Sequence, residues 1–358
     1  MRIRKNYLWV AVAALVIIGG VITAVLLRKR AAPDAARLLP ECDAVVYANL
    51  APIRLLTDLG KSTPPERDPQ YEDFVRQTGF EFERDLEKAA LAIHYGKAGR
   101  AKPGETRYSE ILQGHFDRTR VANYLHKLAS GVEPYQGYDI YLVPVEDRTL
   151  RVVLLGVDIA AASNTETPDT IHGMIDRYRR AALPFTGPTL VSEYYGRVPL
   201  GSIVWTIARP PSASGQKNQD ELLLPGGWSG LLPPDSVVIA SARPLNDVHL
   251  RAQVITGSEA EAEAFTQQMQ AYLALFKSLD VSMDGGGPDK DVKAAFDSLT
   301  VQRENSEVVL TAKVPFGFFK KLLAAPPIEI APQASKPDQQ QSPASPSPKK
   351  KSPHAKKH

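Results

Sequence analysis

The sequence predicts an α+β fold with mainly antiparallel sheets and packed helices, carried behind one N-terminal transmembrane helix. Three observations support this prediction: an apolar run at residues 7–27, β-branched segments that recur with prolines at fixed distances, and capped amphipathic helices. Strands and helices are mixed without strict βαβ alternation, which favours antiparallel over parallel pairing. The soluble part is therefore expected to repeat a strand–Pro–helix unit.

The first expected element is the membrane helix. Residues 7–27 form 21 uncharged, mostly apolar positions, and a helix of that length covers about 31 Å, the thickness of a bilayer core. The run ends at Arg28-Lys29-Arg30 without a small-residue cleavage site, and Glu41 before Cys42 does not fit a lipobox. We expect an uncleaved, single-pass anchor that contacts the lipid bilayer and follows a basic stub, residues 1–6.

The orientation of this anchor rests on its flanks. Basic residues lie on both sides of the run, so the positive-inside rule nearly cancels. The stub is short, which favours a cytoplasmic N-terminus and an extracytoplasmic body. Gly20 and Ala24 form a small-xxx-small pair that can pack two anchors together, which leaves a homo-oligomer open.

Charge is unevenly distributed along the chain. The 358 residues carry 43 Lys+Arg and 40 Asp+Glu, yet residues 31–331 hold 31 bases and 39 acids. An acidic body between a basic membrane flank and a basic tail argues against nucleic acid as the ligand of the folded part. Cys42 is the single cysteine, which excludes an intramolecular disulfide and a cysteine-rich metal site.

An internal repeat organises the soluble part. Leu38-Leu39-Pro40, followed by Val45-Val46, resembles Leu231-Leu232-Pro233, followed by Val237-Val238, and a proline ends each copy (Pro52 and Pro244). The same strand-then-proline spacing recurs at 203–210 and 308–315. This pattern predicts two related α+β modules, residues 38–184 and 185–330, after a linker at 28–37.

Each repeated unit has a physical reason. The β-branched run predicts a buried strand, and proline ends it because proline cannot donate to the ladder. Proline is also favoured in the first helical turn. The apolar residues that follow Pro52 and Pro315 therefore predict short helices packed back on the sheet; they are Ile53, Leu55 and Leu56, and Phe316, Phe318, Phe319, Leu322 and Leu323.

Three further helices begin at recognisable caps: Asp117, Thr167-Pro168, and Ser258 with Glu261 as a capping box. Their expected apolar stripes are Val121, Leu125 and Leu128; Ile171, Met174, Ile175 and Tyr178; and Phe265, Met269, Leu273 and Phe276. Strands are expected near 108–116, 139–145, 149–156, 202–208, 236–242, 248–256 and 306–314.

The C-terminal segment 331–358 is rich in Pro, Ser, Gln and Lys. Because its Pro/Ser/Lys part offers nothing large and apolar to bury, we expect it to be disordered. Its lysines are candidates for binding an anionic polymer, an anionic lipid or nucleic acid; the alternative is a solvated extension. The candidate residues are Lys349, Lys350, Lys351, Lys356 and Lys357.

Motifs that would carry other chemistry are weak. Residues 280–291 start like an EF-hand loop, but Asp291 at position twelve is short and Gly287 replaces an apolar residue, so no metal site is predicted. The sequence contains no glycine-rich phosphate loop, so no cofactor is predicted. A dispersed triad that uses Ser192 or Ser202 remains an alternative, although no G-x-S-x-G elbow is present.

Five histidines lie in the body outside any metal-ligand spacing: His94, His115, His126, His172 and His249. His126 and His172 fall beside the apolar stripes of their helices, so both are expected on the solvated surface. Trp205 with Tyr194-Tyr195 either lines a ligand groove or, more in keeping with aromatic residues at such positions, packs in the core.

Three segments together resemble a broad group of uncharacterised bacterial envelope proteins with one anchor and repeated strand–helix modules: residues 38–52, 250–276 and 308–323. That resemblance implies no catalytic residues. The sequence therefore favours a membrane-anchored extracytoplasmic binding or scaffolding protein whose protein partner is unknown. The alternatives are a membrane-tethered hydrolase and a cytoplasm-facing protein whose tail binds nucleic acid.

Overall fold

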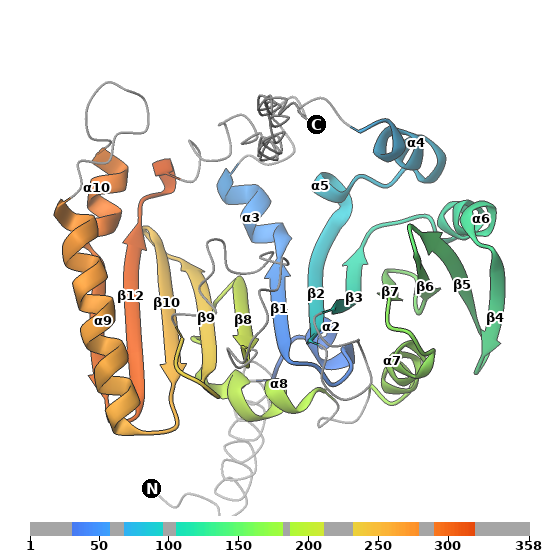
Figure 1. Cartoon of the computed structure of the whole chain (residues 1–358). Coiled ribbons are helices and arrows are strands. Elements are labelled where there is room, and N and C mark those ends of the chain that lie inside the picture. The colour runs from blue at the N-terminus through green and yellow to red at the C-terminus, as the bar shows by residue number, and fades with distance from the viewer. Residues whose placement is uncertain are drawn as a thin grey trace, which may run out of the picture.

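A computed structural model describes residues 31–57, 68–95, 105–181, 187–210, 232–278 and 290–318. They build one antiparallel sheet of twelve strands, in the order β11-β12-β10-β9-β8-β1-β2-β3-β7-β6-β5-β4 (Figure 1). The α+β class and the antiparallel pairing are therefore confirmed, with one continuous sheet through both predicted modules.

The strands are short to medium in length. Their bounds are β1 Ala44–Asn49, β2 Leu86–Tyr95, β3 Thr106–Gly114, β4 Gly131–Tyr135, β5 Tyr138–Val145, β6 Arg148–Leu154, β7 Ile159–Ser163, β8 Val204–Ala208, β9 Val237–Pro244, β10 Val248–Ile255, β11 Thr300–Glu304 and β12 Glu307–Val314. The seven strands expected from the sequence are all present.

Helices occupy both faces and one end of the sheet. Their bounds are α2 Asp34–Leu38, α3 Leu50–Thr57, α4 Pro69–Thr78, α5 Phe82–Asp85, α6 Arg118–Leu128, α7 Asp169–Arg179, α8 Thr189–Tyr194, the 3-10 turn η1 Tyr195–Arg197, α9 Glu259–Ser278 and α10 Lys290–Asp297.

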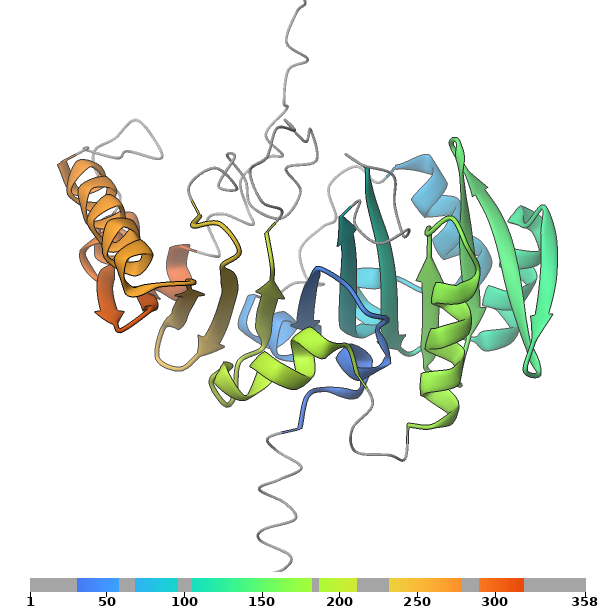
Figure 2. The ribbon, with the colours of Figure 1, turned by 60° about the horizontal axis from the view of Figure 1, so that its bottom comes forward.

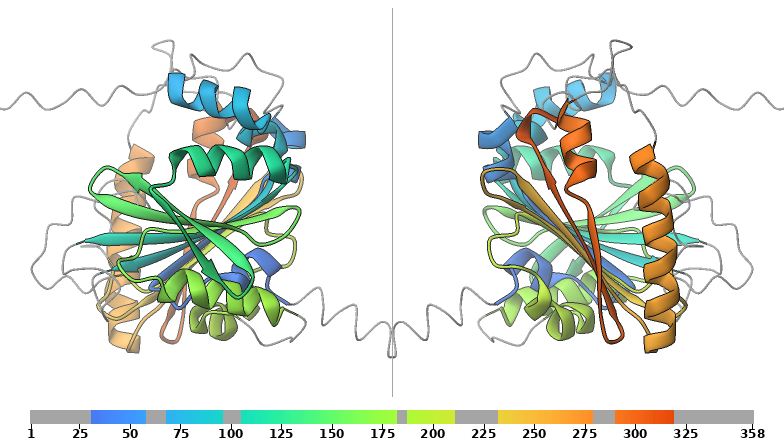
Figure 3. Two further views of the ribbon diagram at one scale, coloured as in Figure 1. Left: turned by 90° about the vertical axis from the view of Figure 1, so that its right-hand side faces the viewer. Right: turned by 90° about the vertical axis from the view of Figure 1, so that its left-hand side faces the viewer.

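We name the two sheet faces after the helices that cover them. The α7/α8 face carries the main core, where Ile171, Met174 and Leu190 pack on strand residues such as Ile111 and Ile207. On the opposite α6/α9 face, α9 covers β9, β10 and β12, and α6 covers β5 to β7. Figure 2 shows α7 and α8 along one side of the sheet, and Figure 3 shows α4 and α6 on the other side from α7.

The strand order repeats outward from the centre of the sheet. From β1 it runs β1-β2-β3 and then β7, and from β8 it runs β8-β9-β10 and then β12, with α6 and α9 in corresponding places along the chain. The central β1·β8 pair is antiparallel, with Tyr47 opposite Trp205. By position, the counterpart of β1 is β8.

This arrangement corrects the repeat alignment. The sequence match set the strand after Leu38 against the strand after Leu231, but that second strand, β9, occupies the position of β2. Pro244 also departs from the strand–Pro–helix unit, because it ends β9 at a tight turn into β10 in which the Leu245 amide donates to the Asp247 carbonyl. Short matches of β-branched residues reflect burial, which many strands share.

The predicted helix starts are confirmed at three places. Asp117 accepts from the Thr119 and Arg120 amides at the start of α6. Ser258 accepts from the Glu261 amide before α9, although Glu261 reaches back to the Gly257 amide, one residue earlier than in an ideal capping box. Pro168 precedes α7, whose Ile171, Met174 and Ile175 are buried as expected, whereas Tyr178 is only half-buried.

Three smaller expectations are wrong. The predicted linker 28–37 includes most of α2, whose Ala35 and Ala36 are buried against the main core. In α3, which starts before Pro52, Leu55 is 86% exposed, and Leu128 at the end of α6 is 45% exposed. Terminal helical turns project beyond the sheet edge, so apolar periodicity alone overestimates their burial.

The predicted anchor at 7–27 and the tail 331–358 lie outside the described residues. Among the helices that the structure describes, none combines the length and the apolar character that crossing a membrane requires.

Candidate functional site

Four basic side chains gather on the α7/α8 face, beyond the part that α8 covers. Arg243, His249 and Lys313 form one cross-strand row, because β9 pairs Arg243 with His249 and β12 pairs His249 with Lys313. Arg251 stands two residues along β10, between Ser241 and Thr311. Adjacent strands are about 4.8 Å apart, so the row spans roughly 10 Å. We call these four residues the basic cluster.

The basic cluster lacks acidic partners. Within the part of the chain that the structure describes, none of its members forms an ion pair. The nearest strand carboxylate, Glu307, is already engaged by Arg197 at 2.5 Å and by the Gln253 amide at 2.5 Å.

Unsatisfied polar atoms lie beside these cations. Seven buried side-chain atoms of the described residues make no hydrogen bond, and three of them belong to this part of the sheet: Asn49 Oδ1, Trp205 Nε1 and Arg243 Nε. Trp205 lies directly opposite Ser241, and the stem of Arg243 runs over Gly201, in contact range of where a Cβ would be. Buried polar groups are almost always paired in proteins, so these three mark a place where a partner is missing.

Local sequence explains the position of this site. In β10, His249, Arg251 and Gln253 alternate with Val248, Leu250, Ala252 and Val254. The apolar set faces the α6/α9 side, where Val254 packs beneath α9, so the polar set must face the other way. The turn between β9 and β10 then sets Arg243 opposite His249. Arg243, His249 and Arg251 are half-buried and Lys313 is exposed.

Trp205 itself is a core residue. Its side chain is 1% exposed and stacks on Tyr47 at 5.3 Å, with Tyr195 tilted against it at the same distance. The sequence-based groove of Trp205 and Tyr194-Tyr195 is therefore mainly packing, although Arg209 lies over the Tyr194 ring at 5.8 Å. Burial raises the pKa of the Tyr47 hydroxyl to about 12.

The serines weighed for a hydrolase do not meet a histidine. The Ser192 hydroxyl donates to the Thr189 carbonyl at 2.9 Å, and the Ser202 hydroxyl donates to the Pro199 carbonyl at 2.7 Å. Both bonds cap local turns. Neither geometry activates a nucleophile, because activation needs a base within hydrogen-bond reach.

A different serine does contact a histidine, deep in the sheet. His94 Nε2 lies 3.0 Å from Ser109 Oγ, which lies 2.9 Å from Ser163 Oγ, which in turn lies 3.0 Å from Thr165 Oγ1. His94 and Ser109 are fully buried, so a substrate has no path to this pair. The chain of hydroxyls satisfies buried polar groups and holds β2, β3 and β7 together.

The two histidines expected on the solvated surface, His126 and His172, differ in their surroundings. His126 is exposed, as expected, with its ring edge on Tyr141. His172 is not freely solvated, because its ring stacks on Tyr135 at 3.7 Å and its Nε2 lies 3.0 Å from Glu133. The expectation for His172 was wrong because the apolar periodicity of a helix does not reveal which strand packs beside it; here β4 contacts His172.

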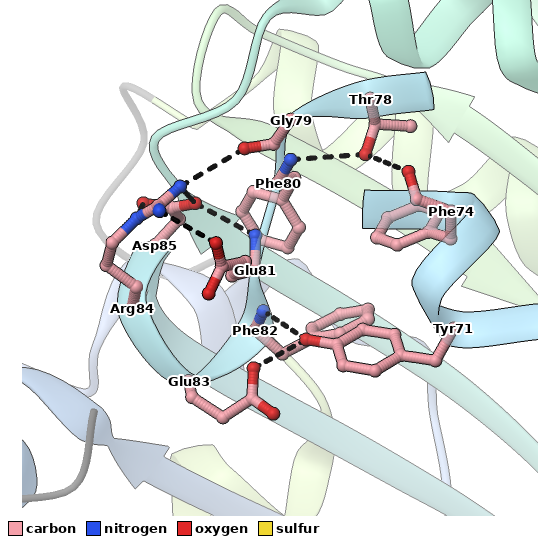
Figure 4. Close-up of polar contacts among 10 residues, drawn as sticks. All are labelled: Tyr71, Phe74, Thr78, Gly79, Phe80, Glu81, Phe82, Glu83, Arg84 and Asp85. Atoms are coloured by element: carbon pink, nitrogen blue, oxygen red, sulfur yellow. Dashed lines mark hydrogen bonds and ion pairs between the residues drawn. The ribbon is translucent and has the colours of Figure 1, made fainter. Parts of the chain in front are cut away.

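An aromatic cluster of α4, α5 and the residues between them is a second feature, and only its Phe82 is exposed (Figure 4). Phe74 stacks with Phe82 at 5.6 Å and meets Phe80 edge-on at 6.2 Å. The Tyr71 hydroxyl accepts from the Phe82 amide at 3.0 Å and donates to Glu83 at 2.5 Å. Every polar group drawn there has a partner, which indicates a structural cap on the sheet end.

Several binding and metal-ligand candidates from the sequence lie outside the described residues. They are the tail lysines 349–351 and 356–357 and most of the loop 280–291. In the described part, no group of three potential metal-ligating side chains comes together. The basic cluster is therefore the main chemical feature that sequence reasoning missed; the alternation in β10 was its visible signal.

Comparison with known proteins adds little. No protein-family model and no curated protein matches the chain. Crystal forms III, IV and I of TP0453 are similar in fold, with TM-scores of 0.46, 0.42 and 0.41 and identities of 10%, 9% and 11%. Each alignment covers 82% of this chain and 97–98% of TP0453. A likeness this distant carries no argument about what the chain binds.

Proposed function

We propose that this chain is a single-pass membrane protein whose body lies outside the cytoplasm and binds ligands with closely spaced anionic groups through the basic cluster. The membrane part rests on residues 7–27 and their flanks. The binding part rests on one observation: Arg243, His249 and Lys313 stand in a single cross-strand row without a carboxylate partner.

The chemistry of the row favours binding over catalysis. Arginine forks and a lysine ammonium are the usual partners of phosphate and carboxylate groups. The flanking hydroxyls of Ser241, Thr311 and Thr300 can add hydrogen bonds, since they occupy the next row of the sheet on β9, β12 and the edge strand β11. His249 is the one side chain of the row that can accept a proton, and no carboxylate among the described residues pairs with it to orient it as a general base.

Acidic side chains lie on other parts of the molecule than the basic cluster does. The first turn of α9, on the opposite face, carries Glu259 and Glu261, and the first turn of α4 carries the exposed Glu72. An anionic polymer is therefore repelled from those surfaces and directed to the basic cluster. The tail lysines would add a second, less specific attraction.

The test is binding of inorganic polyphosphate by the full chain in neutral nanodiscs. The variant Arg243→Gln/Arg251→Gln/Lys313→Gln should bind at least about tenfold more weakly, because three charge-assisted contacts are lost. The control variant Arg303→Gln/Lys290→Gln/Lys293→Gln removes the same charge from exposed positions outside the cluster and should bind nearly as the parent does. Equal weakening of both variants would reduce the proposal to general charge attraction.

A further inference from the structure

The α6/α9 face carries one charged side chain in an otherwise uncharged row that crosses all twelve strands. The strand registers place these residues side by side, from one sheet edge to the other: Val301, Leu310, Ala252, Ala240, Thr206, Val46, Leu91, Glu110, Ala162, Val152, Tyr141 and Val132. Only Glu110 brings a charge to this row.

Among the described residues, Glu110 has no polar partner. Its cross-strand neighbours are Leu91 and Ala162, and Tyr108 and Leu112 stand two residues away on β3. Within the described part of the chain, its carboxylate makes no hydrogen bond and no ion pair. The other polar residue of the row, Thr206, is satisfied because its hydroxyl donates to the Val45 carbonyl at 2.9 Å.

The apolar surroundings make the ionised form of the Glu110 carboxyl unfavourable in free energy. Burial raises the pKa of the Glu110 carboxyl above its ordinary value. An ionised group at an apolar position is stabilised only by an opposite charge or by donors, and neither is present among the neighbouring strand residues. A leucine or a glutamine at the same place would be easier to accommodate.

Glu110 is nevertheless reachable. It is half-buried, as are Val46, Leu91 and Leu112 around it. Of the described helices, α9 packs on β9, β10 and β12 and α6 packs on β5 to β7. α3 contacts the start of β2, where Arg54 donates to the Leu86 carbonyl. Figure 1 shows β8, β1, β2 and β3 between α9 and α6. The carboxylate therefore stands on the central strands of the face with partial access to solvent.

We propose that these central strands bind an amphiphile with a primary ammonium headgroup, whose nitrogen pairs with Glu110 and whose alkyl chain lies on the neighbouring apolar residues. The ammonium supplies the missing charge and donors, and the chain covers half-buried surface such as Leu91 and Leu112. The row offers no cation, so a zwitterionic phospholipid headgroup would leave its phosphate without a partner. This site is independent of the basic cluster, which lies on the other face.

The test uses the full chain in phosphatidylcholine nanodiscs with hexylammonium, hexanol and hexanoate as matched probes. Hexylammonium should bind about tenfold more tightly than hexanol, and hexanoate should not bind. Glu110→Gln should abolish this preference, whereas Glu304→Gln, a carboxylate exposed on the edge strand, should keep it. Lyso-phosphatidylethanolamine tests the zwitterion and should bind more weakly than an alkylammonium of equal chain length.

Two further readouts keep the proposal falsifiable if Glu110→Gln folds poorly. In the parent chain with ¹³C-labelled glutamate carboxyls, hexylammonium should shift the Glu110 resonance and leave that of Glu304 in place. Glu110→Leu should raise the midpoint of thermal unfolding without ligand and lose the ammonium preference. An unchanged Glu110 resonance, or equal affinity for hexylammonium and hexanol, would overturn the proposal.

Discussion

Individual buried polar side chains in this protein fall into two groups, those with partners and those without. His94, Ser109, Ser163 and Thr165 form a chain of hydrogen bonds at 2.9–3.0 Å that ends at the Thr167 carbonyl. Asn49 and Arg243, by contrast, keep buried atoms without a partner among the described residues. The first group stabilises the sheet, and the second group marks a surface that a ligand can complete.

Replacing His94 by leucine should lower the free energy of unfolding by about 1–3 kcal/mol, because Ser109 and its neighbours lose a buried partner. Chemical denaturation of the full chain measures this change. Ser192→Ala removes an exposed hydroxyl and serves as the control, with an effect within about 0.5 kcal/mol. If His94→Leu were as mild as that control, the hydroxyl chain would not contribute to stability.

The buried Tyr47 and the half-buried Tyr95 predict a loss of stability in alkali. Burial is the main cause that raises the pKa of both Tyr47 and Tyr95 to about 12, from an ordinary value of 10.0. Below pH 10 both folded and unfolded states keep these protons. Between pH 10 and pH 12 the unfolded state ionises first, so the free energy of unfolding falls, by as much as about 2–3 kcal/mol for Tyr47.

Denaturation at pH 8, 10, 11 and 12 tests this pH dependence, with Tyr47→Phe as the informative variant. That variant cannot ionise at position 47, so its stability should decline less steeply above pH 10 than the parent's. Parallel declines in the parent and in Tyr47→Phe would show that the Tyr47 hydroxyl does not stay protonated in the folded chain.

Among the elements, the junction of β2 and β3 is the tightest. A Cβ on Gly114 would lie 2.4 Å from the Asp85 carbonyl oxygen, which is backbone and cannot move aside easily. Gly114→Ala should therefore destabilise the protein by at least about 1–3 kcal/mol. Gly196→Ala is the matched control, because a Cβ there meets nothing within 4 Å. Similar melting temperatures for the two variants would contradict this close approach.

Elements with strong local signals could be predicted from the sequence, and those defined by pairing could not. Asp117 and Ser258 identified the starts of α6 and α9, because capping is a short-range hydrogen bond. The polar alternation of β10 was visible too. That Arg243 stands opposite His249, however, depends on strand register, which single-sequence periodicity does not contain.

The same limit explains the misassigned repeat. Leu38 to Pro52 and Leu231 to Pro244 share burial and a terminal proline, yet their strands occupy different places in the sheet. The order of strands depends on non-local pairing, which becomes visible only in the folded chain. The position of Glu110 in an uncharged row is hidden for the same reason, since its neighbours come from β2 and β7.

For the whole molecule, the anchor is the prediction with the widest consequence. Protein isolated from membranes should retain residues 7–27, because this segment has the length of a membrane helix and no cleavage site follows it. Intact mass and N-terminal sequencing measure this directly. A mature N-terminus near residues 31–40 would mean that a signal peptide is removed instead.

We expect the folded body, and not only the tail, to bind anionic ligands. The most direct test of this expectation is the slope of log Kd against log salt for inorganic polyphosphate, measured on four full-chain forms in nanodiscs: the parent, deletion of 332–358, Arg243→Gln/Arg251→Gln/Lys313→Gln, and the two changes combined. We expect the deletion to keep binding with a shallower slope, and the triple variant to lose roughly one unit of slope per cation removed. If the tail deletion alone abolished binding, and the triple variant kept the parent's slope, the basic cluster would have no part in ligand binding.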